Sequence, residues 1–234
     1  MIGEPRLYAP ECESTQLLLL GADLPEGAVA FTDHQTAGRG RLGRTWEEAP
    51  GTAVLCSILL RPPADRRPPE LSLVAAVAVA EAVEGATGLA AQVKWPNDVM
   101  LNRRKVAGIL AEMRDDTVVV GIGVNVNQTR EHLPQDARTP AGSLRVLTGR
   151  EYDRGEVLSL VLGQLDAHYA RWLVAGLDGV FDELGSRDFL RGRRVRVGDE
   201  SGTAVQIDRD GRLQIAFDGG GHRAIESGEV EFER

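Results

Sequence analysis

Residues 92–126 read QVKWPNDVMLNRRKVAGILAEMRDDTVVVGIGVNV, and this stretch decides the fold class. It contains four short apolar runs, which are residues 92–95, 99–101, 105–113 and 117–126. The runs are separated by Pro-Asn-Asp, Asn-Arg-Arg and Asp-Asp, which are turn-forming sequences. Short β-prone runs joined by tight turns are typical of consecutive antiparallel strands. The stretch therefore predicts an antiparallel meander.

The segments before the meander predict further strands and two helices. Residues 27–32 and 52–60 are apolar runs that predict buried strands. In residues 14–20 a Ser-Thr pair precedes an apolar run that stops at Gly21, which predicts a short helix with a hydroxyl N-cap and a glycine stop. Residues 71–86 are mostly apolar and rich in Ala, which predicts a helix packed closely against the sheet.

After the meander the pattern changes twice. Residues 156–175 carry apolar side chains at helical spacing, and residues 180–190 predict a second helix. From Arg193 onward, short runs with period two alternate with Gly, Asp and Ser turns, which predicts five strands in a small SH3-like barrel. We therefore expect an α+β protein, with a mixed, mostly antiparallel sheet and packed helices in residues 1–190 and the small barrel in residues 191–234.

Composition excludes several classes of protein. The chain has 234 residues, a formal net charge of -8 and a sequence pI near 5.1. Because nucleic-acid binding needs a basic surface, this charge argues against a general DNA- or RNA-binding protein. Two cysteines without a pairing or metal-binding pattern, and a start without a signal peptide, predict a reduced cytoplasmic protein. The apolar stretch of residues 71–83 is too short for a membrane span and contains Glu81, so we expect no membrane insertion.

The most informative motif is GRGRLGRTW, residues 38–46. Three glycines and three arginines alternate within residues 38–44. Glycine permits close backbone approach, and arginine supplies planar, permanently charged donors for phosphate or carboxylate. The motif thus indicates a loop that folds over a phosphate-bearing ligand, although it is not a P-loop. The alternatives are a solvated loop or an RNA-binding segment, but RNA-binding tracts of this kind are longer, repetitive and basic.

Three motifs lie on the predicted meander. KWPND, residues 94–98, leads a strand lysine into a Pro-Asn-Asp corner, and turn chemistry alone accounts for it in isolation. KVAGIL, residues 105–110, and GIGVNVN, residues 121–127, lie on the next two strands. Glycines inside an apolar strand often mark the close approach of a ligand or of another backbone. Asn125 and Asn127 share one face of their strand, which faces either a ligand or solvent.

Taken together, these motifs resemble those of the biotin protein ligases. QTAGRGRLGRTW (residues 35–46) and the three meander motifs occur in the order of that family, and Ser14-Thr15 matches its Ser-Thr-Asn segment. The resemblance covers nearly the whole chain, including the small C-terminal barrel. It implies the class II synthetase-like catalytic fold. It also implies an enzyme that uses ATP to convert biotin to biotinyl-AMP, releases pyrophosphate, and transfers biotin to a lysine on the carrier domain of acetyl-CoA carboxylase or a related acyl-CoA carboxylase.

The resemblance also assigns roles to single residues. It implies that Lys105 and Arg41 are catalytic, with Lys105 bridging the biotin carboxylate and the α-phosphate. Asp98 either holds Mg²⁺ or positions the incoming lysine amine. The residues implied to bind biotin are Ser14, Thr15, Gln16, Gln35, Arg39, Gly40, Arg41 and Lys105, and Gln16 stands where the family usually has Asn. Those implied to bind the nucleotide are Arg39, Arg44, Trp46, Lys94, Asn97 and Asn125.

The charges of these residues agree with such a reaction. Biotin carboxylate and ATP are both anionic, so cations are needed to bring them together. Arg39, Arg41, Arg44 and Lys105, together with Mg²⁺, can stabilise the charge that builds on the α-phosphate as pyrophosphate leaves. The biotin carboxylate itself attacks, so no protein nucleophile is required. The Gly-Arg loop is also expected to shield the reactive biotinyl-AMP from water.

Two other functions remain open. A lipoate or octanoate ligase or transferase of the same fold also acylates carrier lysines, but the GRGRxGR loop favours biotin. A non-catalytic biotin- or nucleotide-binding regulator would not need Lys105 and Arg41. Some members of the family carry an N-terminal DNA-binding domain, but only thirteen residues precede Ser14, so we expect neither DNA binding nor repression. Composition leaves the oligomeric state open between a monomer and a homodimer.

Overall fold

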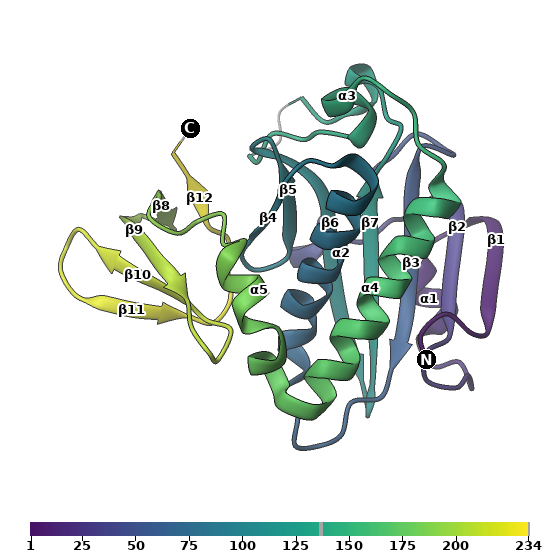
Figure 1. The fold of residues 1–234 in the computed structure, drawn as a ribbon, viewed down its shortest axis with the longest axis horizontal. Helices are drawn as coiled ribbons and strands as arrows, with labels where there is room; N and C mark the ends of the chain where they lie inside the picture. Colours follow the sequence, from purple (N-terminus) through teal and green to yellow (C-terminus); the bar gives the residue numbers. More distant parts are fainter. Residues whose placement is uncertain (136–137, 234) are drawn as a thin grey trace.

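The computed structural model of the chain describes residues 1–135 and 138–233. These residues form a seven-stranded mixed sheet, covered by helices, and a separate five-stranded antiparallel sheet (Figure 1). The strand order of the large sheet is β1-β2-β3-β7-β6-β5-β4. Its strands are β1 (Arg6–Cys12), β2 (Val29–Gln35), β3 (Ala53–Leu60), β4 (Ala91–Lys94), β5 (Asp98–Leu101), β6 (Arg104–Arg114) and β7 (Thr117–Asn125).

The predicted meander is confirmed. Strands β4, β5, β6 and β7 pair with one another in antiparallel fashion, and their bounds agree with the predicted runs to within one residue. Asn102 and Arg103 join β5 to β6 with positive φ angles of 47° and 62°. Backbone of this kind occurs in the tightest hairpin turns, and Asn adopts it more readily than most residues.

Strand β1 is not predicted from the sequence. It pairs only with β2, in parallel, at the edge of the sheet, and its residues are exposed or half-buried. The strand contains Pro10 and two charged residues, which are tolerated at an edge because half of the backbone groups there face solvent. An edge strand of this kind has no continuous apolar face that would reveal it.

The helices pack on both faces of the large sheet. They are α1 (Thr15–Leu19), α2 (Leu71–Thr87), α3 (Leu144–Thr148), α4 (Arg154–Ala175) and α5 (Phe181–Ser186). Helices α2 and α4 lie side by side over one face, whereas α1 contacts β2, β3 and β7 on the other (Figure 1). No helix in the described residues is both long and apolar enough to cross a membrane.

Every residue of β3 is buried because both faces of the strand are covered. Cys56 and Ile58 belong to the large core under α2, and Leu59 belongs to a smaller core beside α1. Side chains alternate between the two faces of a strand. Leu55 and Ser57 therefore lie on the same face as Leu59, the face of α1.

The second helix predicted near the C-terminus is shorter than expected. Helix α5 ends at Ser186, not at residue 190, so the last third of that prediction is wrong. The backbone after α5 pairs with β4 instead: Val93 N donates to Arg187 O at 2.8 Å, and Phe189 N donates to Val93 O at 2.9 Å. The carbonyl of Arg187 and the N–H of Phe189 are thus bonded to β4, so they are not available for the hydrogen bonds of a longer helix.

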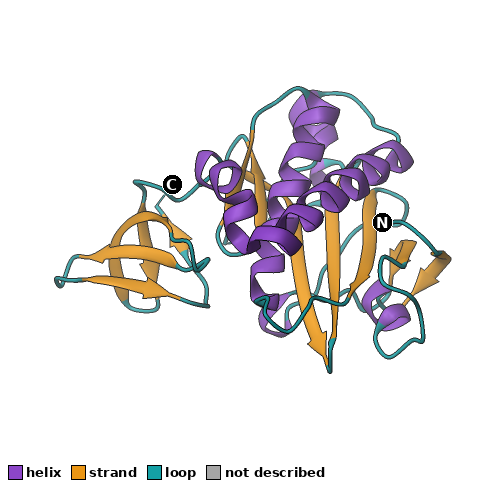
Figure 2. Cartoon of the chain, turned by 60° about the horizontal axis from the view of Figure 1, so that its bottom comes forward, coloured by secondary structure: helices purple, strands orange, loops and turns teal. Residues whose placement is uncertain are grey.

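The small sheet contains the five strands that the sequence predicts, but it is not a closed barrel. Its order is β11-β10-β9-β8-β12, so β11 and β12 are its two edges (Figure 2). The terminal strand is only two residues long and pairs with β8, which leaves it too short to close the sheet. Trp95 Nε1 donates to Gly211 O at 2.9 Å and thus ties the two sheets together. The strands are β8 (Arg194–Val197), β9 (Glu200–Ile207), β10 (Leu213–Phe217), β11 (His222–Ile225) and β12 (Glu231–Phe232).

Candidate active site

A cavity of about 400 Å³ lies on the α1 face of the large sheet. It is bounded by α1, by residues 38–46, by strands β3 to β7 and by residues 228–232 of the small sheet. We call residues 38–46 the Gly-Arg flap. The structure brings together at this cavity all but one of the residues predicted for the site: Ser14, Thr15, Gln16, Gln35, Arg39, Gly40, Arg41, Arg44, Trp46, Lys94, Asn97, Asp98 and Lys105.

Strand register sets the floor of the cavity. Leu55, Gly123, Gly108, Asp98 and Lys94 are successive register partners across β3, β7, β6, β5 and β4, and all of them line the cavity. Because neighbouring strands lie about 4.8 Å apart, this row spans about 19 Å. The floor can thus hold an extended ligand. It has glycines in its middle and charged residues at the β4 end.

A β-bulge directs Lys105 into the cavity. The register of β5 with β6 shifts after Val99, and the successive residues Val106 and Ala107 are both buried in the core under α2. Strict alternation would place one of them on the opposite face, so the bulge absorbs one residue and re-aims the next side chain. Lys105 thereby returns to the cavity face, where its Nζ lies 2.6 Å from Asp98 Oδ1.

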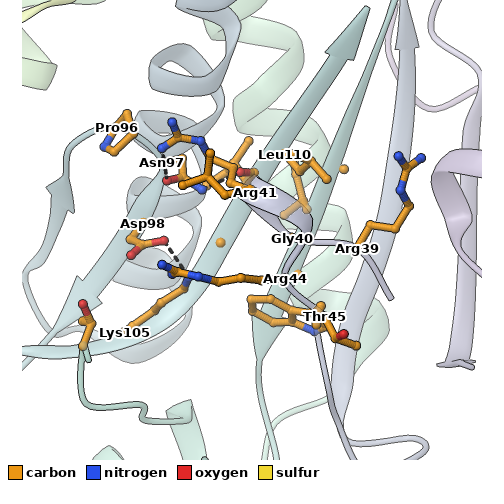
Figure 3. A pocket seen from close by; sticks show the side chains of 18 of the residues that line it. Arg39, Gly40, Arg41, Arg44, Thr45, Pro96, Asn97, Asp98, Lys105 and Leu110 are labelled. Atoms are coloured by element: carbon orange, nitrogen blue, oxygen red, sulfur yellow. Dashed lines mark hydrogen bonds and ion pairs between the residues drawn. The ribbon is translucent and has the colours of Figure 1, made fainter. Parts of the chain in front are cut away.

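Asp98 lies between two lysines. Its Oδ1 faces Lys105 (Figure 3). Its Oδ2 is 4.0 Å from Nζ of Lys94. Lys94 is only 7% exposed, and this burial lowers the pKa of its ammonium group. Asp98 and, to a smaller extent, Glu231 oppose that shift, whereas the positive charges of Lys105 and Arg44 add to it. Five lining cations, Lys94, Lys105, Arg41, Arg44 and Arg138, outnumber the three lining carboxylates, Asp98, Glu229 and Glu231, so this end of the cavity is suited to an anionic ligand.

The Gly-Arg flap is a small hairpin. Gly40 N donates to Arg44 O at 2.7 Å, and Trp46 N donates to Gly38 O at 2.9 Å. A Cβ atom at Gly38 would lie 2.4 Å from the carbonyl oxygen of Trp46, so only glycine fits there. This glycine therefore serves the close approach of the two flap strands to each other rather than of a ligand.

The flap arginines point in different directions (Figure 3). Arg41 Nη1 donates to Asn97 Oδ1 at 3.2 Å, and burial lowers the pKa of Arg41. Arg39 points away from Asp98, and its Nη2 lies 2.7 Å from Glu112 Oε1. Arg41 is thus the flap arginine that contacts the corner between β4 and β5, next to the Asp98–Lys105 ion pair.

Trp46 lies directly on two glycines of the floor. A Cβ atom at Gly123 would be 2.6 Å from Cε2 and Cζ2 of the indole, and one at Gly108 would be 2.9 Å from Cζ3. The Nζ of Lys105 is 5.7 Å from the ring centroid, within cation–π range. The indole Nε1 is buried without a hydrogen-bond partner in the described residues. Such an orphaned donor at a cavity wall is a position for a ligand acceptor.

Thr15 and Gln35 form the polar group at the α1 end of the cavity. Thr15 N donates to Gln35 Oε1 at 2.9 Å, and Thr15 Oγ1 donates to the same oxygen at 3.2 Å. Ser14 occupies the N-cap position, but its side chain makes no capping bond, so the predicted hydroxyl cap is wrong. The cap is not needed, because Gln35 accepts from Thr15 N and the carbonyl of Ser14 accepts from Leu17 N.

Gln16 lines the cavity, yet its amide serves the sheet. Its Nε2 donates to Leu110 O at 3.0 Å and to Val119 O at 3.4 Å. Gly121 makes room for this side chain, since a Cβ atom there would lie 3.0 Å from Gln16 Cδ. Contact of Gln16 with biotin stays a prediction, and the bonds seen give the residue a structural role.

Asn125 is the predicted site residue that the structure does not bring to the cavity. Its Nδ2 donates to Gly142 O, and its Oδ1 accepts from Gln128 Nε2, both at 2.9 Å. Asn127 exchanges two hydrogen bonds with the backbone of Tyr152. The two side chains thus hold the loops that follow β7, a role that neither of the alternatives weighed from the sequence includes. A nucleotide contact of Asn125 stays a prediction.

Several lining residues are missed from the sequence. Ser57 has a signal, because it is a hydroxyl residue inside a wholly buried apolar strand. The lining residues of the small sheet and of the loop before α3 have no such signal in the sequence, because only tertiary contacts bring them to the cavity. Arg44 forms an ion pair with Glu229, whose other oxygen lies 2.6 Å from Nη1 of Arg138. The missed residues that carry charged, hydroxyl or aromatic side chains are Thr45, Ser57, Arg138, Thr139, Glu229, Glu231 and Phe232, and of these only Thr45 lies within a motif singled out from the sequence.

Comparison with known proteins identifies the family. The profile of the Biotin/lipoate A/B protein ligase family matches residues 10–128, and that of the biotin protein ligase C-terminal domain matches residues 191–233. The biotin–acetyl-CoA-carboxylase ligase of Paracoccus denitrificans is 35% identical, over 97% of this chain and 99% of its own length. The chain belongs to the biotin protein ligase family.

Other members of this family agree. The biotin–acetyl-CoA-carboxylase ligase of Mycobacterium tuberculosis is 37% identical, over 88% of this chain and 79% of its own length. The solved biotin protein ligase from Aquifex aeolicus, in complex with biotin and ATP, superposes with a TM-score of 0.88 at 32% identity. That match covers 99% of this chain and 100% of the Aquifex chain. The chain is accordingly an enzyme with the biotin ligase fold.

Mg²⁺ does not fit Asp98 as this ligase presents it. Both carboxylate oxygens face ammonium groups, at 2.6 Å and 4.0 Å, and these repel a divalent cation. Within residues 1–135 and 138–233, no group of three or more His, Cys, Asp or Glu side chains could hold a metal ion. The need for Mg²⁺ stays a prediction without an assigned protein ligand, and no chemical step below depends on it.

Proposed function

We propose that this chain is an ATP-dependent biotin protein ligase that carries out two successive reactions. It first joins biotin to AMP with release of pyrophosphate, and then transfers biotin to a lysine on the carrier domain of acetyl-CoA carboxylase or a related acyl-CoA carboxylase. The observation that carries this proposal is the convergence of Arg41 and Lys105, from the flap and from β6, on the corner formed by Asn97 and Asp98. The names of the relatives and the biotin and ATP bound to the Aquifex ligase support it.

The proposed orientation of the ligands follows from the two ends of the cavity. The biotin ring lies at the α1 end, where Thr15 and Gln35 provide polar groups that carry no formal charge. The nucleotide lies toward the β4 end, where the cations and the indole of Trp46 gather. The carboxylate of biotin then meets the α-phosphate near Lys105 and Arg41.

In the first reaction, a biotin carboxylate oxygen attacks the α-phosphorus. The bond from that phosphorus to the oxygen bridging to the β-phosphate breaks, and pyrophosphate leaves with the bonding electrons. Lys105 and Arg41 supply positive charge where negative charge develops on the α-phosphate oxygens. Because both groups are held before the reaction, by Asp98 and Asn97, little reorganisation is needed.

In the second reaction, a neutral lysine amine of the carrier attacks the acyl carbon of biotinyl-AMP. An amide bond forms, the acyl–phosphate bond breaks, AMP leaves, and one proton is released. Asp98 is the lining carboxylate nearest to Lys105, so it is placed to hold the entering amine. We assign it this role in preference to metal binding. The flap would keep water from the mixed anhydride until the carrier arrives.

The experiment that tests this function measures both reactions. Biotin-dependent exchange of labelled pyrophosphate into ATP reports the first, and intact-mass analysis of a carrier domain reports the second. We expect both to occur with the wild-type chain and to be lost together in Lys105→Ala. Biotin binding without exchange at high enzyme concentration would instead show a non-catalytic binder.

Substrate choice needs a separate test. We expect biotin, and not lipoate or octanoate, to raise the melting temperature, because a ligand that binds only the folded state stabilises it. Stabilisation by lipoate alone would contradict the choice of biotin. The division of the chain at residues 190 and 191, its cytoplasmic location and its monomeric or dimeric state remain proposals.

A further inference from the structure

A chain of hydrogen bonds runs along the α1 end of the cavity. Gln35 N donates to Glu48 Oε1 at 3.0 Å, which fixes the backbone of Gln35. The side chain of Gln35 accepts from Thr15, and Oγ1 of Thr15 lies 2.7 Å from Oγ of Ser57. Ser57 lies on β3, is 0% exposed and lines the cavity. No residue of this chain of bonds carries a formal charge except Glu48.

The direction of each bond follows from the donors available. A backbone N–H can only donate, so the atom of Gln35 that faces Thr15 N must be the amide oxygen. Thr15 Oγ1 lies 3.2 Å from that same oxygen, and two oxygens at this distance repel unless a hydrogen lies between them. Thr15 therefore gives its single hydroxyl hydrogen to Gln35. The 2.7 Å contact then requires Ser57 to donate to Thr15.

This direction determines what the wall offers a ligand. Ser57 has used its only hydrogen, so its oxygen can act toward the cavity only as an acceptor. Gln35 has used its oxygen, so its amide nitrogen offers two N–H donors. The cyclic urea of biotin has the opposite pattern, a carbonyl acceptor flanked by two N–H donors. The dithiolane ring of lipoate has no N–H and would leave both groups unpaired.

We propose that Ser57 is a specificity-determining residue, whose oxygen accepts a hydrogen bond from one ureido N–H while Gln35 donates to the ureido carbonyl. This inference rests on the proposed function, since it deepens the choice of biotin. A ring bound over Ser57 excludes water from this otherwise buried residue, so nothing replaces the missing donor when a ring without N–H groups binds. Buried polar groups left unpaired in this way are what give hydrogen-bonding sites their strongest discrimination.

The test is titration calorimetry with biotin and with two analogues, each methylated on a different ureido nitrogen. In Ser57→Ala we expect the Kd for biotin to rise about ten- to hundredfold. Methylation of the nitrogen that faces Ser57 should raise the Kd strongly in the wild type. In Ser57→Ala, the factor by which this methylation raises the Kd should be at least ten times smaller. Methylation of the other nitrogen should weaken binding equally in both. Ser57→Cys, which nearly keeps the side-chain volume, should lie between the wild type and Ser57→Ala.

Ser143→Ala is the matched control. Ser143 is also 0% exposed, but its hydroxyl donates to Gln128 O and caps α3, away from the cavity. We expect this variant to lose stability without any change in biotin affinity. Failure of the wild type to bind biotin would reject the proposed function itself. Normal biotin affinity in Ser57→Ala would overturn the role of Ser57 alone. So would an equal loss of affinity for biotin and for both analogues in this variant, because a merely structural role through Thr15 would not distinguish one ureido nitrogen from the other.

Discussion

Replacement of Gly123 by alanine tests how the flap closes over the floor. The added Cβ would lie 2.6 Å from Cε2 and Cζ2 of Trp46, whereas an ordinary contact measures at least 3.4 Å, so the indole must move by close to 1 Å. The backbone of β7 cannot yield easily, because it pairs with β3 on one side and β6 on the other. The flap is a surface hairpin and yields instead. Overpacking of this kind costs about 1–3 kcal/mol.

The expected result separates activity from stability. Since 1.4 kcal/mol corresponds to a tenfold change, closure of the flap should be weakened roughly ten- to hundredfold, and kcat/KM for ATP in pyrophosphate exchange should fall by that factor. The free energy of unfolding should fall by less than this cost of about 1–3 kcal/mol, because only the flap yields and because alanine restricts the unfolded chain more than glycine does.

A double-mutant cycle with Trp46→Ala decides whether the contact is the cause. In the Trp46→Ala background, Gly123→Ala should have almost no further effect on kcat/KM. An equal fall in both backgrounds would refute the reasoning. Gly85→Ala is the control: it lies in α2 with nothing within 4 Å of an added Cβ, and it should leave activity unchanged.

Four further variants test the assigned roles. Lys105→Ala should slow single-turnover formation of biotinyl-AMP about 10²- to 10³-fold, and a near-normal rate would reject its catalytic role. Arg41→Ala should release biotinyl-AMP into solution faster than the wild type does, as measured by filtration of the reaction mixture; an unchanged rate would count against flap closure. Burial lowers the pKa of Lys94 from its ordinary value of 10.5, so the unfolded chain binds more protons just below that pH and stability rises with pH there. Lys94→Met should remove this rise in urea unfolding at pH 7.5 and 9.5, and an identical rise in the variant would contradict it. Asn125→Ala should cost about 1–3 kcal/mol of stability, because Gly142 loses a buried donor, and should leave KM for ATP unchanged; a raised KM would place Asn125 at the nucleotide.

The core of the fold is predictable because its physical cause is local. Strand β3 and helix α2 are continuous apolar runs, and the turns of the meander carry residues suited to them. Strand β1 is not predictable in this way, because an edge strand with half-exposed residues has no periodic apolar face. The end of α5 and the open form of the small sheet are also not predictable from the sequence. Both depend on which backbone groups, distant along the chain, form hydrogen bonds with these residues.

The site, like the fold, is predictable where its cause is local and not where it depends on contacts between distant parts of the chain. The flap and the KWPND and KVAGIL motifs are predicted to meet, and they do. Strand register aligns Lys94, Asp98 and Gly108 in one row, and the flap reaches that row through Arg41, which donates to Asn97. Asn125 does not line the cavity, although the sequence assigned it to the site. The alternation of side chains along a strand predicts which face Asn125 lies on, but not that the loop after β7 provides its hydrogen-bond partner, Gly142. Glu229 and Arg138 could not be found, because the small sheet and a loop bring them in from far along the chain.

The most direct test of the account is a crystal structure with a non-hydrolysable analogue of biotinyl-AMP. We predict that Arg41 and Lys105 both contact the group that links biotin to AMP, with the ureido ring beside Thr15 and Gln35 and the adenine toward Trp46. An analogue bound with Arg41 and Lys105 on separate surfaces would contradict the central claim, even if the fold and the family are unchanged.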